Sequence, residues 1–189
     1  MTSRHEHAVA ILLAAGSGSR FGAGTHKLLA TFRGRPLFQH ALDSVMSANF
    51  SRVIVVTGAV ELELPNEVLN VHNADWSSGQ LSSLRAGLAS ATGADLAVIG
   101  LADQPFVTAE AWTSVSSSTR NIAIATYDGV RGHPVGIAAH LWDAALSSSH
   151  HDDEGLRSFM RLHPELVEEV PCKGSPIDID TPEDLEQWT

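Results

Sequence analysis

The residues best suited to chemistry in this chain form a segment of small residues with two basic side chains close by. The segment reads Leu12-Leu13-Ala14-Ala15-Gly16-Ser17-Gly18-Ser19-Arg20-Phe21-Gly22. It begins at the end of the apolar run Ala8–Leu13, which is typical of a buried parallel strand. Small residues allow a sharp turn whose N–H groups can approach an anion, and Arg20 and Lys27 add fixed positive charge. This combination favours a polyphosphate site over an ordinary glycine-rich strand–helix turn.

Two common phosphate-binding motifs are excluded by the same residues. A P-loop needs Lys followed by Ser or Thr after its second glycine, whereas Gly18 is followed by Ser19-Arg20. A dinucleotide fingerprint needs a third glycine where Phe21 stands and an acidic residue about 20 positions further on. The segment therefore predicts a different kind of nucleotide site.

Two aspartates later in the chain are candidates for holding a cation. Asp103 follows the apolar run Leu96–Leu101, and Asp180 follows a short β-like segment. Each could instead cap a helix, but Thr108 and Thr181 are better placed for that role. Carboxylates at neighbouring strand ends could hold Mg²⁺ while nucleotide phosphates complete its shell.

Asp178 leaves an alternative open for the second carboxylate. It lies two residues before Asp180, on the same face of an extended chain, and could replace or assist it.

The elements that must position these residues alternate between strands and helices. Predicted strands are Ala8–Leu13, Arg52–Thr57, Glu67–Val71, Leu96–Leu101, Asn121–Thr126, Val135–Ile137 and Val167–Val170. Predicted helices are Pro36–Ala48, Leu81–Ala91, Ala109–Ser117, Leu141–Leu146, Gly155–Leu162 and one capped by Thr181. This alternation indicates an α/β fold with a mostly parallel sheet covered on both faces, in which ligands bind beyond the carboxyl ends of strands.

Length and composition narrow the classes of protein. The 189 residues suit one domain spanning 1–189, and the net charge of −10 without a basic cluster argues against a nucleic-acid partner. No apolar stretch approaches the ~20 residues of a membrane span, and the polar N-terminus lacks a signal peptide's apolar core. The single Cys172 excludes an internal disulfide. Together these features favour a cytoplasmic protein without a membrane partner.

Five segments in order resemble the MobA-like NTP transferase family, and most closely its molybdenum cofactor cytidylyltransferase branch. They are the glycine-rich segment with Lys27, residues 73–88, Leu101-Ala102-Asp103-Gln104-Pro105, Arg131-Gly132-His133-Pro134 and residues 178–185. The resemblance implies a single-domain, Rossmann-like, three-layer sandwich of the nucleotide-diphospho-sugar transferase type. It also implies Mg²⁺-dependent transfer of CMP from CTP to a phosphate acceptor, with release of pyrophosphate. The acceptor most in keeping with the resemblance is molybdopterin, with a molybdoenzyme as recipient of the product, and another phosphate, such as a sugar phosphate or phospholactate, stays open as the acceptor. The run Leu13-Ala14-Ala15-Gly16 resembles the cytidine-using enzymes more than the guanosine-using ones.

The resemblance also assigns roles to individual residues. Catalysis falls to Arg20, Lys27 and Asp103, and the metal to Asp103 and Asp180. The nucleotide-binding residues would be Leu13, Ala14, Ala15, Gly16, Ser17, Gly18, Ser19, Arg20, Lys27, Ser82 and Ser83, and the acceptor-binding residues His133, Pro134 and Asp153. Three assignments compete with structural roles, because Ser82 and Ser83 could cap a helix, His133 could be structural, and Asp153 could begin a solvated helix.

The chain also departs from the family pattern in two places. Four residues separate Gly22 from Lys27, where the branch usually has fewer, and His26 is unusual before the lysine. An Asp152-Asp153 pair replaces the more common Gly-Asp. Two other functions remain open: an NAD(P)H-linked oxidoreductase that has changed chemistry, and a non-catalytic nucleotide-binding module.

Overall fold

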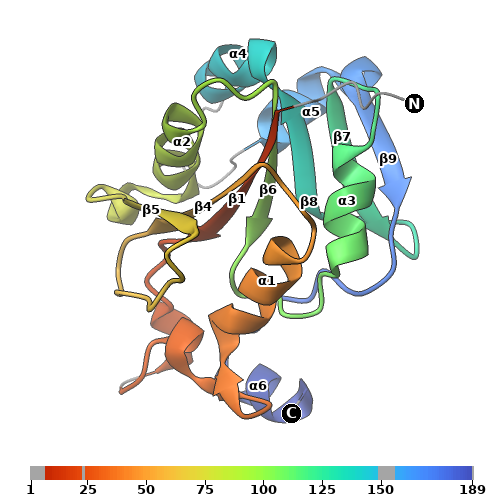
Figure 1. The fold of residues 1–189 in the computed structure, drawn as a ribbon. Helices are drawn as coiled ribbons and strands as arrows, with labels where there is room; N and C mark the ends of the chain where they lie inside the picture. The colour runs from red at the N-terminus through yellow and green to blue at the C-terminus, as the bar shows by residue number, and fades with distance from the viewer. Residues whose placement is uncertain (1–6, 23, 149–155, 189) are drawn as a thin grey trace.

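A seven-stranded sheet forms the centre of the computed structural model, which describes residues 7–22, 24–148 and 156–188 (Figure 1). The strands are ordered β5-β4-β1-β6-β8-β7-β9. Their bounds are β1 Ala8–Ala14, β4 Arg52–Thr57, β5 Val68–His72, β6 Leu96–Leu101, β7 Ile122–Tyr127, β8 Val130–Ala138 and β9 Val167–Pro171. Only β8 runs against its neighbours, so the prediction of a mostly parallel sheet is confirmed.

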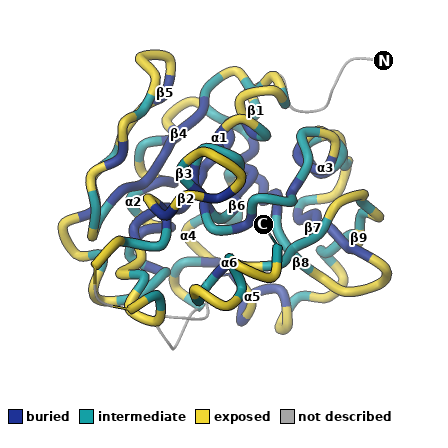
Figure 2. The backbone as a smooth tube through the Cα atoms, turned by 90° about the horizontal axis from the view of Figure 1, so that it is seen from below, coloured by how far each residue is buried: buried dark blue, intermediate teal, exposed yellow. Residues whose placement is uncertain are grey.

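Helices cover both faces of this sheet, which gives the three predicted layers (Figure 1). One face packs against α1 Leu37–Met46 and α3 Ala109–Ser116, and the other against α2 Gln80–Ser90, α4 Trp142–Ser147 and α5 Arg157–Leu162. Successive side chains of β1 point alternately into the two cores, so this strand is buried throughout its central part. Dark blue segments in Figure 2 follow this central sheet. The apolar runs in the sequence therefore mark strands that are buried on both sides.

A smaller unit closes the end of the molecule near the C-terminus. The two-stranded ribbon of β2 Thr31–Phe32 and β3 Arg35–Pro36 lies beside α6 Pro182–Trp188. Phe32, Leu37 and Ile179 form a separate buried cluster there, and Arg33 donates to the Trp188 carbonyl at 2.9 Å. This packing fixes the segment that carries Asp180.

Short 3-10 turns connect several elements: η1 Ser19–Phe21, η2 Lys27–Leu29, η3 Trp76–Ser78, η4 Ala139–Leu141 and η5 Pro164–Leu166. Across the described ranges, no helix is both long and apolar enough to cross a membrane.

Candidate active site

A cleft of about 390 Å³ opens beyond the carboxyl ends of β1 and β6. The two strand ends are joined by the Ala102 N–H, which donates to the Leu13 carbonyl at 3.0 Å. From β1 the chain proceeds to β4 and β5 on one side, and it returns to β6 on the other. Ligands of open α/β sheets bind at such a reversal of strand order. The cleft therefore lies where the sequence predicts a ligand-binding site.

Most residues assigned to the nucleotide or metal line this cleft. They are Leu13, Ala14, Ala15, Gly16, Ser17, Gly18, Ser19, Arg20, Lys27, Ser83, Asp103 and Asp180. The structure thus brings together distant parts of the chain, such as Arg20 and Asp180, which are 160 positions apart.

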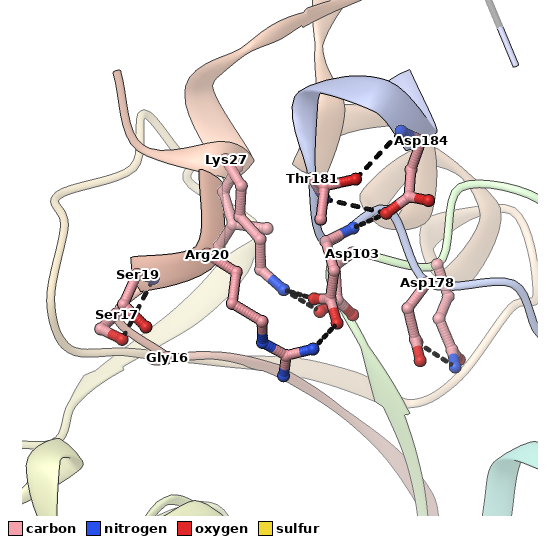
Figure 3. A network of polar contacts seen from close by, with 12 residues as sticks. Gly16, Ser17, Ser19, Arg20, Lys27, Asp103, Asp178, Thr181 and Asp184 are labelled. Carbon is pink, nitrogen blue, oxygen red and sulfur yellow. Dashed lines mark hydrogen bonds and ion pairs between the residues drawn. The ribbon is translucent and has the colours of Figure 1, made fainter. Parts of the chain in front are cut away.

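Lys27 is the centre of an ion network in the cleft (Figure 3). Its Nζ donates to Asp103 Oδ2 at 2.5 Å and to Asp180 Oδ1 at 2.6 Å, while Arg20 donates to Asp180 Oδ2 at 2.6 Å. Burial lowers the pKa of Lys27, but Asp103 and Asp180 more than offset this effect, so the net pKa is raised. Lys27 is therefore a charged ammonium at neutral pH, and one of its three N–H donors remains for a ligand.

The backbone between β1 and η1 can bind an anion. No hydrogen bond within the described part of the chain engages the N–H groups of Gly16, Ser17 or Gly18. Gly18 has φ +60, and a Cβ there would lie 3.1 Å from Lys27 Cγ, so this turn favours glycine. The N–H groups of this loop can thus donate hydrogen bonds to phosphate oxygens close to the Arg20 and Lys27 charges.

His26 braces the same loop. Its Nδ1 accepts from the Leu28 N–H at 3.2 Å, so Nε2 carries the proton and donates to the Gly16 carbonyl at 2.9 Å. Nothing in the sequence alone indicates this contact.

The carboxylates of Asp103 and Asp180 fit a divalent cation. Each has an oxygen against the Lys27 ammonium, so both already face one positive charge. Asp103 Oδ1 is buried and accepts no hydrogen bond from a described residue, which leaves an oxygen for a further ligand. Among the described residues, no group of three or more His, Cys, Asp or Glu side chains forms a closed metal site. Two carboxylates completed by phosphates are the usual protein share of a Mg²⁺ site.

Asp178 is held apart from this pair. Its Oδ1 accepts from Gln104 Nε2 at 2.7 Å, and Gln104 also donates to the Pro176 carbonyl at 3.1 Å. Burial, followed by the Asp103 charge, raises the pKa of Asp178. The geometry therefore favours Asp180 over Asp178 as the partner of Asp103.

One expectation about Asp180 is wrong. The described segment before it belongs to no strand of the sheet, so Asp180 does not follow a strand end as Asp103 does. The Ile179 N–H donates to the Asp103 carbonyl at 3.0 Å, and the buried Ile179 side chain anchors the segment. Asp180 reaches the cleft through this crossing of two loops.

The two candidate serines occupy different positions. Buried Asn73 donates to Ser82 Oγ at 2.8 Å and to Ser83 Oγ at 3.0 Å. Ser82 donates to the Gly79 carbonyl at 2.8 Å and does not line the cleft, whereas Ser83 does. Neither serine caps α2, whose N-cap is Gly79 without a side-chain hydrogen bond. The Ser83 hydroxyl keeps a proton that it can donate to a ligand.

The residues assigned to the acceptor lie apart from the cleft or outside the described ranges. His133 lines a second cavity of about 540 Å³, and Leu13 and Gln80 line both spaces. Pro134 is buried in β8 and is not among the side chains that line that cavity. Asp153 and its neighbour Asp152 lie outside the described residues.

Sequence reasoning assigned no ligand role to several residues that line the cleft: Leu28, Trp76, Ser77, Gly79, Gln80 and Leu101. The position of Trp76 depends on the absence of a side chain at Gly58. A Cβ there would lie 2.6 Å from Trp76 Cβ and 2.8 Å from the Ala15 carbonyl oxygen. The family-like segment 73–88 contains four of these residues and was the available signal.

Comparison with known proteins identifies the family to which this chain belongs. The sequence model of the MobA-like NTP transferase domain matches residues 10–169. Nicotine blue oxidoreductase of Paenarthrobacter nicotinovorans is 36% identical over 194 residues, which cover 93% of each chain. The bifunctional enzyme IspD/IspF of Caulobacter vibrioides is 30% identical over 71% of this chain, but the match spans only 40% of that protein.

Solved structures share the fold over nearly the whole chain. A nucleotidyl transferase from Methanothermobacter thermautotroptrophicus has a TM-score of 0.82 at 22% identity, covering 96% of this chain and 95% of that one. Rv0371c from Mycobacterium tuberculosis in complex with manganese has a TM-score of 0.77 at 24% identity, covering 96% of this chain and 97% of that one.

Proposed function

Because the chain belongs to the MobA-like NTP transferase domain family, we propose that it transfers a nucleoside monophosphate from an NTP to a phosphate-bearing acceptor. The observation that carries this proposal is the Lys27 ammonium between Asp103 and Asp180, at the edge of a loop with unengaged N–H groups. This site combines donors for phosphate oxygens with carboxylates for a cation. Pyrophosphate would be the second product.

The chemistry requires alignment and charge neutralisation. An acceptor phosphate oxygen attacks the α-phosphorus, the bond to the β-phosphate oxygen breaks, and pyrophosphate leaves with the electron pair. The loop from Ala15 to Ser19 holds the β- and γ-phosphates, Arg20 offsets the charge on pyrophosphate, and Lys27 donates to the α-phosphate. No side chain needs to become a covalent intermediate.

A divalent cation, proposed to be Mg²⁺, would be held by Asp103 and Asp180 and would neutralise phosphate charge when bound. The manganese complex of Rv0371c supports this class of ion. Asp103 Oδ1 is buried and accepts no hydrogen bond from a described residue, so it is an oxygen of this site that can take such a ligand.

The finer proposal names CTP and molybdopterin. Ser83 supports a base that carries a carbonyl oxygen, as cytosine does, because its hydroxyl proton could be donated to that oxygen. The run Leu13-Ala14-Ala15-Gly16 adds to this support through its resemblance to cytidine-using enzymes.

Single-turnover release of pyrophosphate tests the reaction. Wild-type protein is mixed with Mg²⁺, molybdopterin and CTP, with GTP, ATP and UTP in parallel. We expect CTP to react fastest, and Lys27→Met and Asp103→Asn to lower the rate on the order of 10²-fold. Arg35→Met is the matched control, because Arg35 makes an ion pair of similar length with Asp43 on the surface. Wild-type rates in both cleft variants would refute the assignment.

A second candidate is an NAD(P)H-linked oxidoreductase, which is favoured by the relative named nicotine blue oxidoreductase. The missing dinucleotide fingerprint carries less weight beside a relative that is 36% identical in an alignment covering 93% of the chain. Thermal shift with CTP, GTP, ATP, UTP and NADPH, each with and without Mg²⁺, separates the two. A ligand at about 100 times its Kd stabilises by about 2.7 kcal/mol, which is a shift of roughly 5–10 °C for a chain of this size. A shift with NADPH and none with any NTP would favour the oxidoreductase.

A further inference from the structure

The loop that follows β6 and the segment that leads into α6 pair with each other along their length. An isolated antiparallel bridge joins Val107 to Gly174 at one end of this pairing. At the other end the Ile179 N–H donates to the Asp103 carbonyl at 3.0 Å. The position of Asp180 relative to Asp103 therefore depends on how these two segments are held together.

The side chain of Gln104 lies between the two ends of this pairing. It is 3% exposed and belongs to the loop that carries Asp103. Its Nε2 donates to the Pro176 carbonyl at 3.1 Å and to Asp178 Oδ1 at 2.7 Å, which uses both protons of the amide nitrogen. Both neighbours are acceptors, so the nitrogen of the amide must face them. A buried amide thus joins the loop of Asp103 to the segment of Asp180.

This amide is a costly choice for stability alone. Gln104 Oε1 is buried and accepts no hydrogen bond from any residue that the structure describes. A buried acceptor without a partner destabilises the fold, whereas an apolar side chain of similar shape, such as methionine, would avoid this penalty. The two contacts that Gln104 donates are therefore better explained by what they position.

Asp178 completes the contact from the other segment. Burial and then the Asp103 charge raise the pKa of Asp178, whereas the hydrogen bond from Gln104 lowers it. Gln104 thus favours the anionic form of a carboxylate that lies near other negative charge. Figure 3 shows the contact of Asp178 apart from the ion network around Lys27. Asp178 therefore holds the segment in place without facing the Lys27 ammonium.

We propose that Gln104 is a positioning residue for the proposed cation site, and that Asp178 is the anchor of this contact rather than a third ligand. The proposal rests on the proposed function, because it concerns the carboxylates that would hold the cation. Through Asp178 and the Pro176 carbonyl, the amide keeps Asp180 opposite Asp103. Groups that hold metal ligands set the orientation of those ligands, and losing one typically weakens metal affinity about 10- to 100-fold.

The affinity for Mn²⁺ tests the role of Gln104. Free Mn²⁺ is measured by electron paramagnetic resonance in the presence of the NTP that shifts the melting temperature most. Gln104→Met keeps the length of the side chain but donates no hydrogen bond, so it should weaken Mn²⁺ binding about 10-fold. It should leave the affinity for the NTP without metal unchanged, because Gln104 does not line the cleft. A purely structural role would not produce this difference between metal and nucleotide.

Gln39→Met is the matched control, because Gln39 lies on α1 and outside the cleft lining. It should change neither affinity. Equal affinities for Mn²⁺ in Gln104→Met and Gln39→Met would overturn the inference.

Two variants at Asp178 separate an anchor from a ligand. Asp178 is exposed, so both should fold. Asp178→Asn keeps an oxygen that can accept from Gln104, Asp178→Ala does not, and both remove the same charge. We expect Asp178→Ala to weaken Mn²⁺ binding at least about 3-fold more than Asp178→Asn does, which corresponds to one hydrogen bond. Equal losses would overturn the anchor role, and this pair decides alone if Gln104→Met does not fold.

A measurement without metal separates this inference from the proposed function. Absence of Mn²⁺ binding by wild type with every NTP would refute the proposed cation site. The position of Asp180 is then read from its contact with Lys27. Lys27→Met should lower the Tm less in the Gln104→Met background, or in Asp178→Ala if Gln104→Met does not fold, than in wild type. An equal fall in Tm in both backgrounds would overturn the inference, and wild-type Mn²⁺ binding that none of these variants weakens would refute the inference alone.

Discussion

Replacing Lys27 by methionine tests the ion network most directly. The side chains of Lys27, Asp103 and Asp180 are 11%, 18% and 25% exposed, so the two carboxylates would lose their shared cation in a largely buried place. Removing one partner of a buried ion pair costs roughly 3–5 kcal/mol, and the partial exposure of the aspartates favours the lower end, about 3 kcal/mol. For a chain of this length that corresponds to a fall in Tm of about 6–12 °C.

Arg35→Met is the matched control for stability as well. The Arg35–Asp43 pair has the same 2.6 Å separation as Lys27–Asp180, but its side chains are 47% and 57% exposed. Its loss should lower the free energy of unfolding by less than about 1 kcal/mol. Adding Asp103→Asn to Lys27→Met removes one unpaired carboxylate and should restore part of the lost stability.

The pH dependence of this effect has a defined sign. The raised pKa of Lys27 means that the folded state binds its proton more tightly than the unfolded state does. Its contribution is therefore complete at neutral pH and is lost only as pH rises through the folded pKa. Denaturant unfolding at pH 7 and pH 9 should give the same gap between wild type and Lys27→Met. A gap below 1 kcal/mol, equal to that of Arg35→Met, would refute the reasoning.

Three further predictions concern other parts of the site. Burial lowers the pKa of folded His133 to about 4, so the free energy of unfolding of the wild type should fall by up to about 3 kcal/mol as pH falls from 6.5 toward 4. The fall should be smaller for His133→Gln, and parallel curves of stability against pH for the two proteins would contradict this prediction. Ser83→Ala should weaken CTP binding, measured by titration calorimetry, about 5- to 10-fold, whereas Ser82→Ala should not change it. Equal effects of the two substitutions would count against a contact between Ser83 and the nucleotide. Gly58→Ala should lower the free energy of unfolding by about 1–3 kcal/mol and weaken CTP binding, because the added Cβ would clash with the Ala15 carbonyl oxygen. Unchanged stability would show that the backbone moves enough to relieve this clash.

The sheet could be predicted from the sequence because its strands are buried on both faces. Arg52–Thr57 and Leu96–Leu101 were expected with the bounds that the structure has, since continuous β-branched and apolar runs leave little ambiguity. β8 was expected only over Val135–Ile137, whereas it covers Val130–Ala138. Its first half is more exposed and contains Gly132 and Pro134, which weaken a strand pattern. The ribbon β2–β3 was not expected because each strand has only two residues.

Within the site, positions fixed by the sheet were easier to predict than positions fixed by loop contacts. Asp103 lies two residues after the end of β6, so topology alone places it at the cleft. Asp180 depends on the buried Ile179 and on a backbone hydrogen bond to Asp103, and Trp76 depends on the absence of a side chain at Gly58. Such contacts join distant segments and leave no periodic signal in the sequence.

The longer connection before Lys27 shows how a local departure can preserve a site. The sequence has more residues between Gly22 and Lys27 than the branch usually has, and no role for His26 was evident. In the structure His26 caps η2 through Leu28 and donates to the Gly16 carbonyl, which ties the end of the longer connection back to the glycine-rich loop. Lys27 begins η2 directly after this brace, and its Nζ contacts both carboxylates. The contacts of His26 therefore compensate for the extra length, because the longer connection needs an added contact to hold Lys27 in place.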